Sequence, residues 1–366
     1  MLYLPERYRR EGITRRPVFK APRAPMRGEY AVRFLNADGT PALATILDHH
    51  GDEIGRRHEL PVRPNLITNA GLDDCVLGSS FAAMRNQLRV GTGSTAPDVG
   101  DTALVAQAQV SATSGLGASE AFTYVGSLNE TRRLTSIVSK RVTMTADRNL
   151  TEFGLSRLAA SNLFVRELFR DELGNPITIT LLTDKILELV HTLTVDLPRS
   201  GGSGSVDIED RDAANNLVGT TTFDVEVGFD DSNSSIAANV ATTWHTFLFG
   251  YGTANAIRVY ASRPSLPATI GASATSFSSV PATEDWPPAP WGDTYSLGSF
   301  QRDFRGVVRV DRCNIEFEAL AMLARLSNVV ACGINIRLDN AAAPFTFEKL
   351  PTHTLEVWGR TSWGRA

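Results

Sequence analysis

Short stretches that alternate between apolar and polar residues, separated by turn residues, run through most of the chain. Residues 29–36 (EYAVRFLN) alternate and are rich in strand-forming residues, Asp38-Gly39 favours a turn, and residues 42–48 resume the pattern. This order predicts a β-hairpin. A second turn at residues 50–52 leads to a shorter predicted strand that ends near Leu60.

The same signals predict further strands at residues 87–90, 123–129, 134–145, 177–182 and 185–197, with a strong turn at 172–176. A short helix is predicted at 69–76 with Asn69 as its N-cap, and 155–170 and 319–326 (ALAMLARL) are the other helical stretches. Many short strands between turns are typical of β-sandwiches and barrels. The predicted fold class is therefore mostly β: two β-sandwich or jelly-roll-like domains, an extended N-terminal arm and few short helices.

The segment 199–205 (RSGGSGS) predicts a domain boundary, because glycine and serine at this density cannot pack a core. The predicted organisation is an extended arm at 1–28, a β domain at 29–198, a Gly/Ser linker at 199–205 and a second β-sandwich-like domain at 206–366. The two halves also echo each other weakly at an offset of about 168 residues, which leaves an internal duplication open.

Composition narrows the class of protein. Hydrophobic residues make up 42% and charged residues 21% of the chain, which indicates a globular protein. We expect no membrane span, because no run of 18 apolar residues occurs, and the start MLYLPERYRRE lacks the apolar stretch of a secretory signal. The three cysteines lack metal or framework spacing; we expect buried free thiols at Cys75, Cys313 and Cys332, with a Cys313–Cys332 bridge left open.

Charge is distributed unevenly between the N-terminal arm and the rest of the chain. Residues 1–27 carry eight basic and two acidic side chains, so they are +6 in a chain of net charge −4. Four prolines there argue against a long helix. We predict a partner-docking arm that orders on an acidic neighbouring subunit, with apolar anchors such as Leu2 and Tyr3; contact with nucleic acid and a solvated tail are the weaker alternatives. The docking residues are Arg7, Arg9, Arg10, Arg15, Arg16, Phe19 and Lys20.

The sequence contains no phosphate loop, HExxH or GxSxG motif. The stretch 91–96 (GTGSTA) follows a predicted strand, but Pro97 and Gly100 follow it in place of a helix, so a glycine-rich β-loop is the better interpretation than a dinucleotide site. Adjacent His49 and His50 in a turn are expected to point in different directions, and His191 is expected to be a half-exposed sheet residue. We therefore predict no catalytic residues, no metal site and no cofactor.

Two local features leave alternatives open. Trp286 and Trp291 flank a proline-rich segment (WPPAPW), a rigid loop that fits stacking on sugars or clamping a partner as well as it fits pinning the loop to its own domain. Asp224 and Glu226 lie two residues apart on one predicted strand. They resemble a glycosidase pair or a calcium loop, but a solvated acidic edge strand is the favoured interpretation.

Residues 65–198 carry an ordered set of motifs: NLITNAGLD, VGTGSTAPDVGDTALV, NLTEFGLS, NLFVRELF and GNPITITLLTDKILELVHTLTVDL. The set resembles a widespread group of virion proteins of tailed bacteriophages, found among tail, baseplate and fibre-associated proteins. In that group a GTG[ST] loop precedes a D-T-A-L segment, and a TEFGL-like motif precedes a strand pair ending in an L-x-V run. The match covers about the central third of the chain; residues 206–366 do not show it clearly. The resemblance implies a structural role in the virion and carries over no catalytic residue.

The expected function is a structural, non-enzymatic component of a tailed phage particle that assembles as a symmetric oligomer in the tail, baseplate or collar and anchors neighbouring proteins or fibres. Expected partners are copies of itself and other phage structural proteins, with a host surface receptor as a further candidate; nucleic acid is not expected. The expected localisation is the virion, after assembly in the host bacterial cytoplasm. The alternative is a receptor- or glycan-binding tail-tip module that uses Trp286 and Trp291.

Overall fold

The structure is a computed structural model. It describes residues 18–20, 22–77, 80–111, 118–125, 131–198, 202–211, 217–230, 245, 248, 255–260, 295–308, 316–317, 319–326, 329–340, 343–344, 347–348 and 355–366. The chain forms two compact units. Unit 2 comprises residues 25–121, 134–195 and 364–366, and unit 1 comprises the remaining three segments, 1–24, 122–133 and 196–363.

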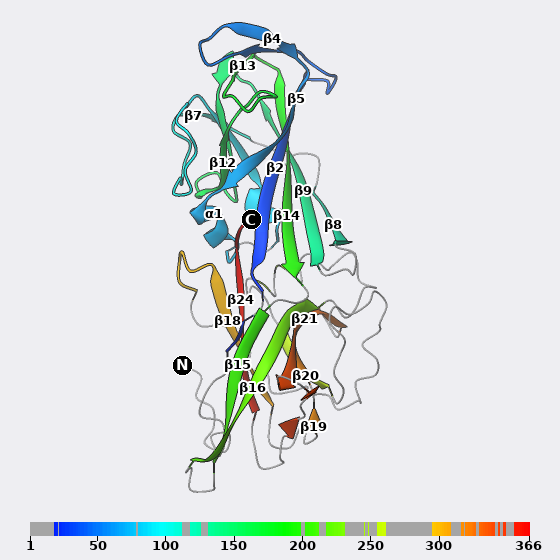
Figure 1. Ribbon diagram of the computed structural model, residues 1–366. Coiled ribbons are helices and arrows are strands. Elements are labelled where there is room, and N and C mark those ends of the chain that lie inside the picture. The colour runs from blue at the N-terminus through cyan, green and yellow to red at the C-terminus, as the bar shows by residue number, and fades with distance from the viewer. Residues whose placement is uncertain are drawn as a thin grey trace. The chain divides into compact units, whose positions relative to one another are not determined.

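Unit 2 is built on one long, curled antiparallel sheet, with strand order β7-β6-β11-β12-β5-β2-β14-β9-β8 (Figure 1). In chain order its strands are β2 (Ala24–Leu35), β5 (Glu59–Ile67), β6 (Gln87–Gly91), β7 (Gln107–Val110), β8 (Ala118–Val125), β9 (Thr131–Thr143), β11 (Glu152–Ser156), β12 (Leu163–Leu168) and β14 (Ile186–Pro198). Strands β2 and β14 pair from Leu35↔Ile186 to Met26↔Val195. Buried and more exposed residues alternate along much of both strands, as in a sheet with one face in the core.

A second, four-stranded antiparallel sheet lies in the same unit, with the order β10-β13-β3-β4. Its strands are β3 (Ala44–Leu47), β4 (Glu53–Arg57), β10 (Arg148–Leu150) and β13 (Thr178–Leu181). The predicted turn at 50–52 is confirmed, because the Asp48 N–H donates to the Asp52 carbonyl and β3 and β4 form a hairpin. The predicted hairpin at 29–48 is only half right: its turn forms, but β2 joins the long sheet and β3 the small one.

Among the described residues, one of the three predicted helical stretches contains a helix. Helix α1 (Asn69–Asp74) lies within the predicted span, but its N-cap is Thr68, whose Oγ1 accepts from the Gly71 N–H at 2.9 Å; η2 (Ala83–Arg85) is a single 3₁₀ turn. The predicted helical stretches are wrong: 155–170 holds the end of β11 and all of β12, and 319–326 is strand β20. Among the described residues, no helix is long and apolar enough to cross a membrane.

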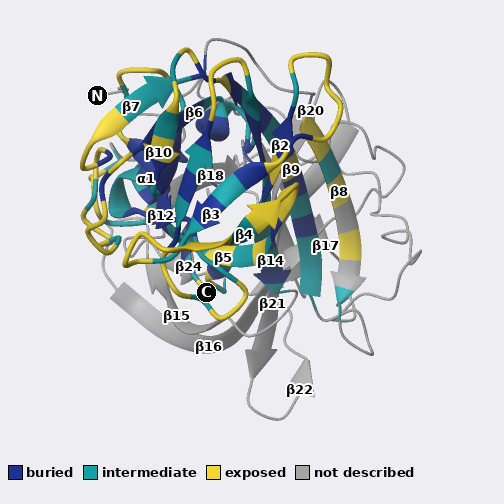
Figure 2. Cartoon of the chain, turned by 90° about the horizontal axis from the view of Figure 1, so that it is seen from above, coloured by how far each residue is buried: buried dark blue, intermediate teal, exposed yellow. Residues whose placement is uncertain are grey.

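The core of unit 2 gathers around β11 and β12, in which every residue is buried. Figure 2 draws buried residues in dark blue. The rings of Tyr30 and Phe153 lie 4.6 Å apart, and that of Phe169 is 5.3 Å from Phe153. Helix α1 contacts β12 closely, since a Cβ at Gly71 would lie 2.7 Å from the Cα of Phe164. These two strands therefore lie at the centre of the core of unit 2. Their polar side chains are shielded from water as well as their apolar ones.

Unit 1 contains a sheet with the order β15-β16-β21-β20-β17, a second grouping in which β24 pairs with β1 and β18, and the pair β19-β23. Its strands are β1 (Val18–Lys20), β15 (Gly202–Arg211), β16 (Leu217–Asp230), β17 (Asn255–Tyr260), β18 (Gln301–Val308), β19 (Glu316–Phe317), β20 (Ala319–Leu326), β21 (Val329–Asn340), β22 (Ala343–Pro344), β23 (Phe347–Glu348) and β24 (Leu355–Arg365). Trp363 is buried there, stacked on Tyr295 with ring centroids 5.7 Å apart.

The mostly β fold class is confirmed, whereas the sandwich or jelly-roll arrangement stays a prediction. The boundaries differ from those expected. Residues 18–20 pair in parallel with β24, and β2 begins at Ala24, so the predicted arm 1–28 loses its last third to regular structure. Residues 202–205 of the predicted linker lie in β15. The two units also interleave along the sequence, with one division falling between Val195 and Asp196 inside β14.

Candidate functional site

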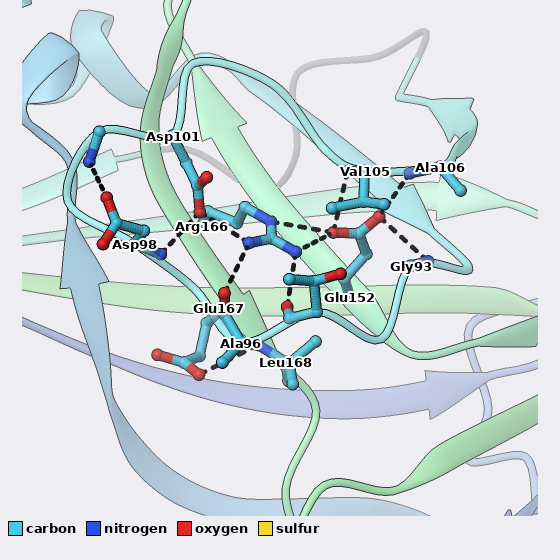
Figure 3. Close-up of polar contacts among 12 residues, drawn as sticks. Gly93, Ala96, Asp98, Asp101, Val105, Ala106, Glu152, Arg166, Glu167 and Leu168 are labelled. Carbon is cyan, nitrogen blue, oxygen red and sulfur yellow. Dashed lines mark hydrogen bonds and ion pairs between the residues drawn. The ribbon is translucent and has the colours of Figure 1, made fainter.

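The ordered motifs of the central third meet in space around two buried, oppositely charged side chains. In β11, Glu152 lies opposite Gly91 of β6, and Gly154 lies opposite Arg166 of β12. Directly opposed residues of antiparallel strands share a face of the sheet, so Glu152 and Arg166 lie on one face. The loop 92–106 covers them there, and it adds Gly93 and Asp101 to what we call the Glu152–Arg166 cluster, made of these four residues (Figure 3).

The Glu152 carboxylate is fully buried, and hydrogen bonds occupy both of its oxygens. Its Oε1 accepts from the backbone N–H groups of Gly93 at 3.1 Å and Ala106 at 2.9 Å. Its Oε2 accepts from the Val105 N–H at 3.3 Å and from Nε of Arg166 at 3.0 Å. A buried charge is tolerated only when it is paired and hydrogen-bonded in this way. One side chain thus satisfies three N–H groups of an irregular loop.

The Arg166 guanidinium is equally enclosed, with 1% of its side chain exposed. Nη1 donates to Oδ2 of Asp101 at 2.6 Å and to the Ala96 carbonyl at 3.3 Å, while Nη2 donates to the Thr95 carbonyl at 2.8 Å. Burial acts to lower the pKa of Arg166, but the hydrogen bonds that it donates to Asp101 and Glu152, together with their negative charges, outweigh it and raise the pKa above its usual value. Arg166 therefore stays charged and binds the loop at Thr95, Ala96 and Asp101.

The glycines of the GTG motif make room for this carboxylate. A Cβ at Gly91 would lie 2.7 Å from Oε1 of Glu152 and 2.6 Å from the Ala106 carbonyl oxygen, and a Cβ at Gly93 would lie 2.6 Å from Cβ of Val105. Such approaches are far inside van der Waals contact. The two glycines are therefore required by the close approach of the loop to Glu152, rather than by a bound phosphate.

The geometry of the cluster favours a structural role. A general base or nucleophile needs a free lone pair that a substrate can reach, and Glu152 offers none because its oxygens are buried and each accepts two hydrogen bonds. Thr151 adds a further bond, from its Oγ1 to the Gly93 carbonyl at 2.7 Å. The arrangement fastens the loop 92–106 to the sheet.

A second buried polar network surrounds His191, which is fully buried rather than half-exposed as predicted. Nη1 of the fully buried Arg85 lies 2.8 Å from its Nδ1, and Nη2 of Arg85 donates to Oγ of Ser136 at 2.6 Å. Because a guanidinium can only donate, Nδ1 must accept and His191 must be neutral. Desolvation, reinforced by the charge of Arg85, holds the pKa of His191 well below its usual value. Desolvation also lowers the pKa of Arg85, to about 9.

Most of the other predicted site residues lie outside the part of the chain that the structure describes. Arg7, Arg9, Arg10, Arg15, Arg16, Trp286 and Trp291 lie outside the described residues, and Phe19 and Lys20 lie in β1, opposite Gly359 and Arg360. Asp224 and Glu226 lie in β16, in register with Asp339 and Arg337 of β21. The predicted edge strand is wrong, because β16 also pairs with β15 on its other side.

The remaining candidates are the adjacent histidines and the cysteine of α1's C-cap. The rings of His49 and His50 do not diverge as expected, because their centroids are 3.7 Å apart. No group of three or more metal-ligating side chains occurs in the part of the chain that is described. Cys75 is a buried free thiol, as predicted, and its burial raises its pKa.

The motifs of residues 65–198 contain every residue of the Glu152–Arg166 cluster, but their patterns do not show that these residues meet. A signal was available, since charged residues inside two uniformly buried strands, LFVREL and EFGLS, are unusual unless they are paired. Comparison of the chain with protein-family models, with curated proteins and with solved structures gives no match.

Proposed function

We propose that this chain is a structural, non-enzymatic component of a tailed bacteriophage particle. It would assemble as a symmetric oligomer in the tail, baseplate or collar and anchor neighbouring proteins or fibres there. The proposal starts from the ordered motifs of residues 65–198, whose order along the chain resembles that of phage virion proteins.

One observation carries the proposal: the separate motifs that make up the resemblance converge on one buried cluster. The GTG loop supplies Gly93, the D-T-A-L segment Asp101, the TEFGL motif Glu152 and the LFVREL strand Arg166. Four chance matches would have no reason to meet around one ion pair, whereas a single structural signature would. The motifs thus belong to one structural feature. This supports a likeness to the phage proteins that rests on shared structure rather than on a shared active site.

The saturation of the cluster supports the non-enzymatic part of the proposal. A loop that is bound to its sheet by a buried ion pair and several backbone hydrogen bonds is rigid, and rigid surfaces lose little conformational entropy when they assemble. Such a surface suits a permanent contact in a particle better than it suits a lid that opens and closes.

The test is the presence, copy number and position of the chain in purified particles produced by cells that carry its gene. Quantitative mass spectrometry should find it at a copy number that matches a rotational symmetry of the tail, and imaging of the particle should place it in a ring or at a fibre attachment point. Particles that lack the chain would overturn the proposal. A position only at the distal tip would instead favour the receptor-binding alternative.

A further inference from the structure

The small sheet of unit 2 has one buried and one open face. On the inner face, Ala44, Ile46, Ile179 and Leu181 are at most 1% exposed. The neighbouring positions point outward, and the register pairs Leu47 with Thr178 and Thr45 with Thr180. Continuing that register by two residues places Leu43 opposite Leu182, and these are 52% and 54% exposed. We call these six residues (Leu43, Thr45, Leu47, Thr178, Thr180 and Leu182) the outer face.

Acidic side chains border the outer face at its leucine end. Asp38 lies in the turn before β3, Asp184 follows β13, and Asp147 accepts a hydrogen bond from the Thr183 N–H at 2.7 Å. Hydrogen bonds from Thr40 lower the pKa of Asp38, so it is charged at neutral pH. Nearby cations include Lys185, whose Nζ donates to Oδ1 of Asn36 at 2.6 Å, and Arg56, which lies opposite Thr45 and pairs with Glu53 at 3.5 Å.

The residues around the outer face also carry a net negative charge. The segments that form the small sheet and its turns, residues 36–59, 145–150 and 171–185, together carry nine acidic and four basic side chains. A sheet face that exposes Leu43 and Leu182 beside threonines, within an acidic region, is expected to bind a segment that is both apolar and basic. Exposed apolar groups clustered on one sheet face are typical of an interaction site.

The N-terminal residues 1–17 have this composition. They contain five arginines and two glutamates, with Leu2, Tyr3, Leu4, Tyr8 and Ile13 interspersed. Fully extended, seventeen residues span roughly 55–60 Å, which is enough to cross from one subunit of an assembly to the next.

We propose that residues 1–17 of one copy of this chain dock on the outer face of the small sheet of a neighbouring copy. The inference deepens the proposed function and rests on it for the symmetric oligomer, since it names the surface that receives the arm. A contact between two different surfaces of the same chain is head-to-tail, and repetition of such a contact closes a ring when the rotation permits.

The face, rather than the edge, of the small sheet receives the arm. Strand β4 lies at the edge, but its register with β3 shifts between Ile46 and Leu47, and it carries Glu53, Arg56 and Arg57 among its five residues. Bulges and charges on an edge strand discourage the addition of a further strand. The outer face has no such protection at Leu43 and Leu182.

The experiment uses the purified full-length chain. A photo-crosslinking amino acid replaces Leu4 or Tyr8, isotopically light and heavy copies are mixed, and the crosslinked peptides are identified by mass spectrometry. We expect mixed light–heavy crosslinks that end on residues 43–47 or 178–182. Crosslinks that join only peptides of the same isotope, or that end elsewhere, would overturn the proposal.

Variants give a second readout by sedimentation of the full-length chain. Leu43→Glu with Leu182→Glu, and separately Arg15→Glu with Arg16→Glu, should each weaken self-association by about tenfold or more. Leu158→Glu is the matched control, because Leu158 is 53% exposed in the loop between β11 and β12, and it should leave association unchanged. Equal weakening by all three variants, or a wild-type chain that does not self-associate, contradicts the docking.

This experiment needs no phage particle, so the two proposals fail separately. Docking that occurs in a chain absent from particles would overturn only the virion role. A chain present in particles whose arm crosslinks elsewhere would overturn only the outer face as the receiving surface.

Discussion

At the scale of single residues, unit 2 depends on charges buried within apolar strands. Glu152 and Arg166 are enclosed and paired at 2.9 Å, whereas the pair between Arg57 and Glu172 is shorter, at 2.6 Å, but lies in solvent. Neutralising one carboxylate should therefore cost more stability at the buried pair than at the exposed pair, because removing one partner of a buried pair leaves the other charge desolvated and unpaired.

Glu152→Gln is expected to lower the free energy of unfolding by about 3–5 kcal/mol, since it removes the fully buried carboxylate that pairs with the Arg166 charge. Glu172→Gln is the control and should cost less than about 1 kcal/mol, because exposed pairs are weak and screened. Urea unfolding of both variants and the wild type measures the difference. Equal effects would show that the Glu152–Arg166 cluster does not stabilise the unit.

His191 predicts a dependence of stability on pH. The pKa of His191 in the folded chain lies well below its value in the unfolded chain, which is about 6.5. At a pH between these two values, only the unfolded chain binds the proton. The free energy of unfolding should therefore fall as the pH drops below about 6.5, by up to about 1.4 kcal/mol per pH unit, and should level off above it.

The comparison that isolates this effect is His191→Asn against the wild type between about pH 5 and 7, followed by urea unfolding. His245 contributes a slope of the same sign, because burial lowers its pKa to about 3, so the variant should lose only part of the dependence. Exposed His50→Asn should retain the whole slope. An unchanged slope in His191→Asn would exclude His191 as a source.

At the scale of elements, the strands around the cluster show why local patterns mislead. Alternation predicts β2 and β14 because each has a core-facing row and an outer row. Strand β12, by contrast, is buried on both faces, so its run LFVREL lacks alternation and falls within a stretch predicted to be helical. Strand β20 has helix-favouring residues (ALAMLARL) but pairs with β17 and β21 on its two sides, and tertiary pairing overrides so weak a preference.

The loop 92–106 supplies a prediction at this scale. Gly93→Ala should destabilise unit 2 by about 1–3 kcal/mol, because its Cβ would overlap Val105 and force the loop away from Glu152. Amide hydrogen exchange should rise at Ala106 and Val105, whose N–H groups donate to Glu152. Ser94→Ala, at an exposed neighbouring position, is the control and should leave exchange unchanged. If Gly93→Ala leaves the stability of unit 2 unchanged, the loop can shift to make room for the added Cβ.

At the scale of the whole molecule, the two units are assembled from discontinuous segments. Unit 2 includes residues 364–366: the Ala366 N–H donates to the Met26 carbonyl, and Arg365 donates to the Ile67 carbonyl and to Oδ1 of Asn69. This bears on any truncation experiment. Deletion of residues 1–27 would remove β1 and the start of β2, including the buried Ala24 and Met26, whereas deletion of 1–16 spares both strands.

The sequence by itself determined the mostly β class, the turns at 50–52 and 172–176 and the strands with one exposed face, because these depend on φ/ψ preferences and on alternation between neighbours. It also contained every residue of the Glu152–Arg166 cluster. Only the tertiary structure decided that Gly93, Asp101, Glu152 and Arg166 meet, that β12 is a strand and that the hairpin at 29–48 divides between two sheets. The physical reason is that burial and pairing across tens of residues are properties of the assembled chain, and no local pattern encodes which distant strand will cover a given face.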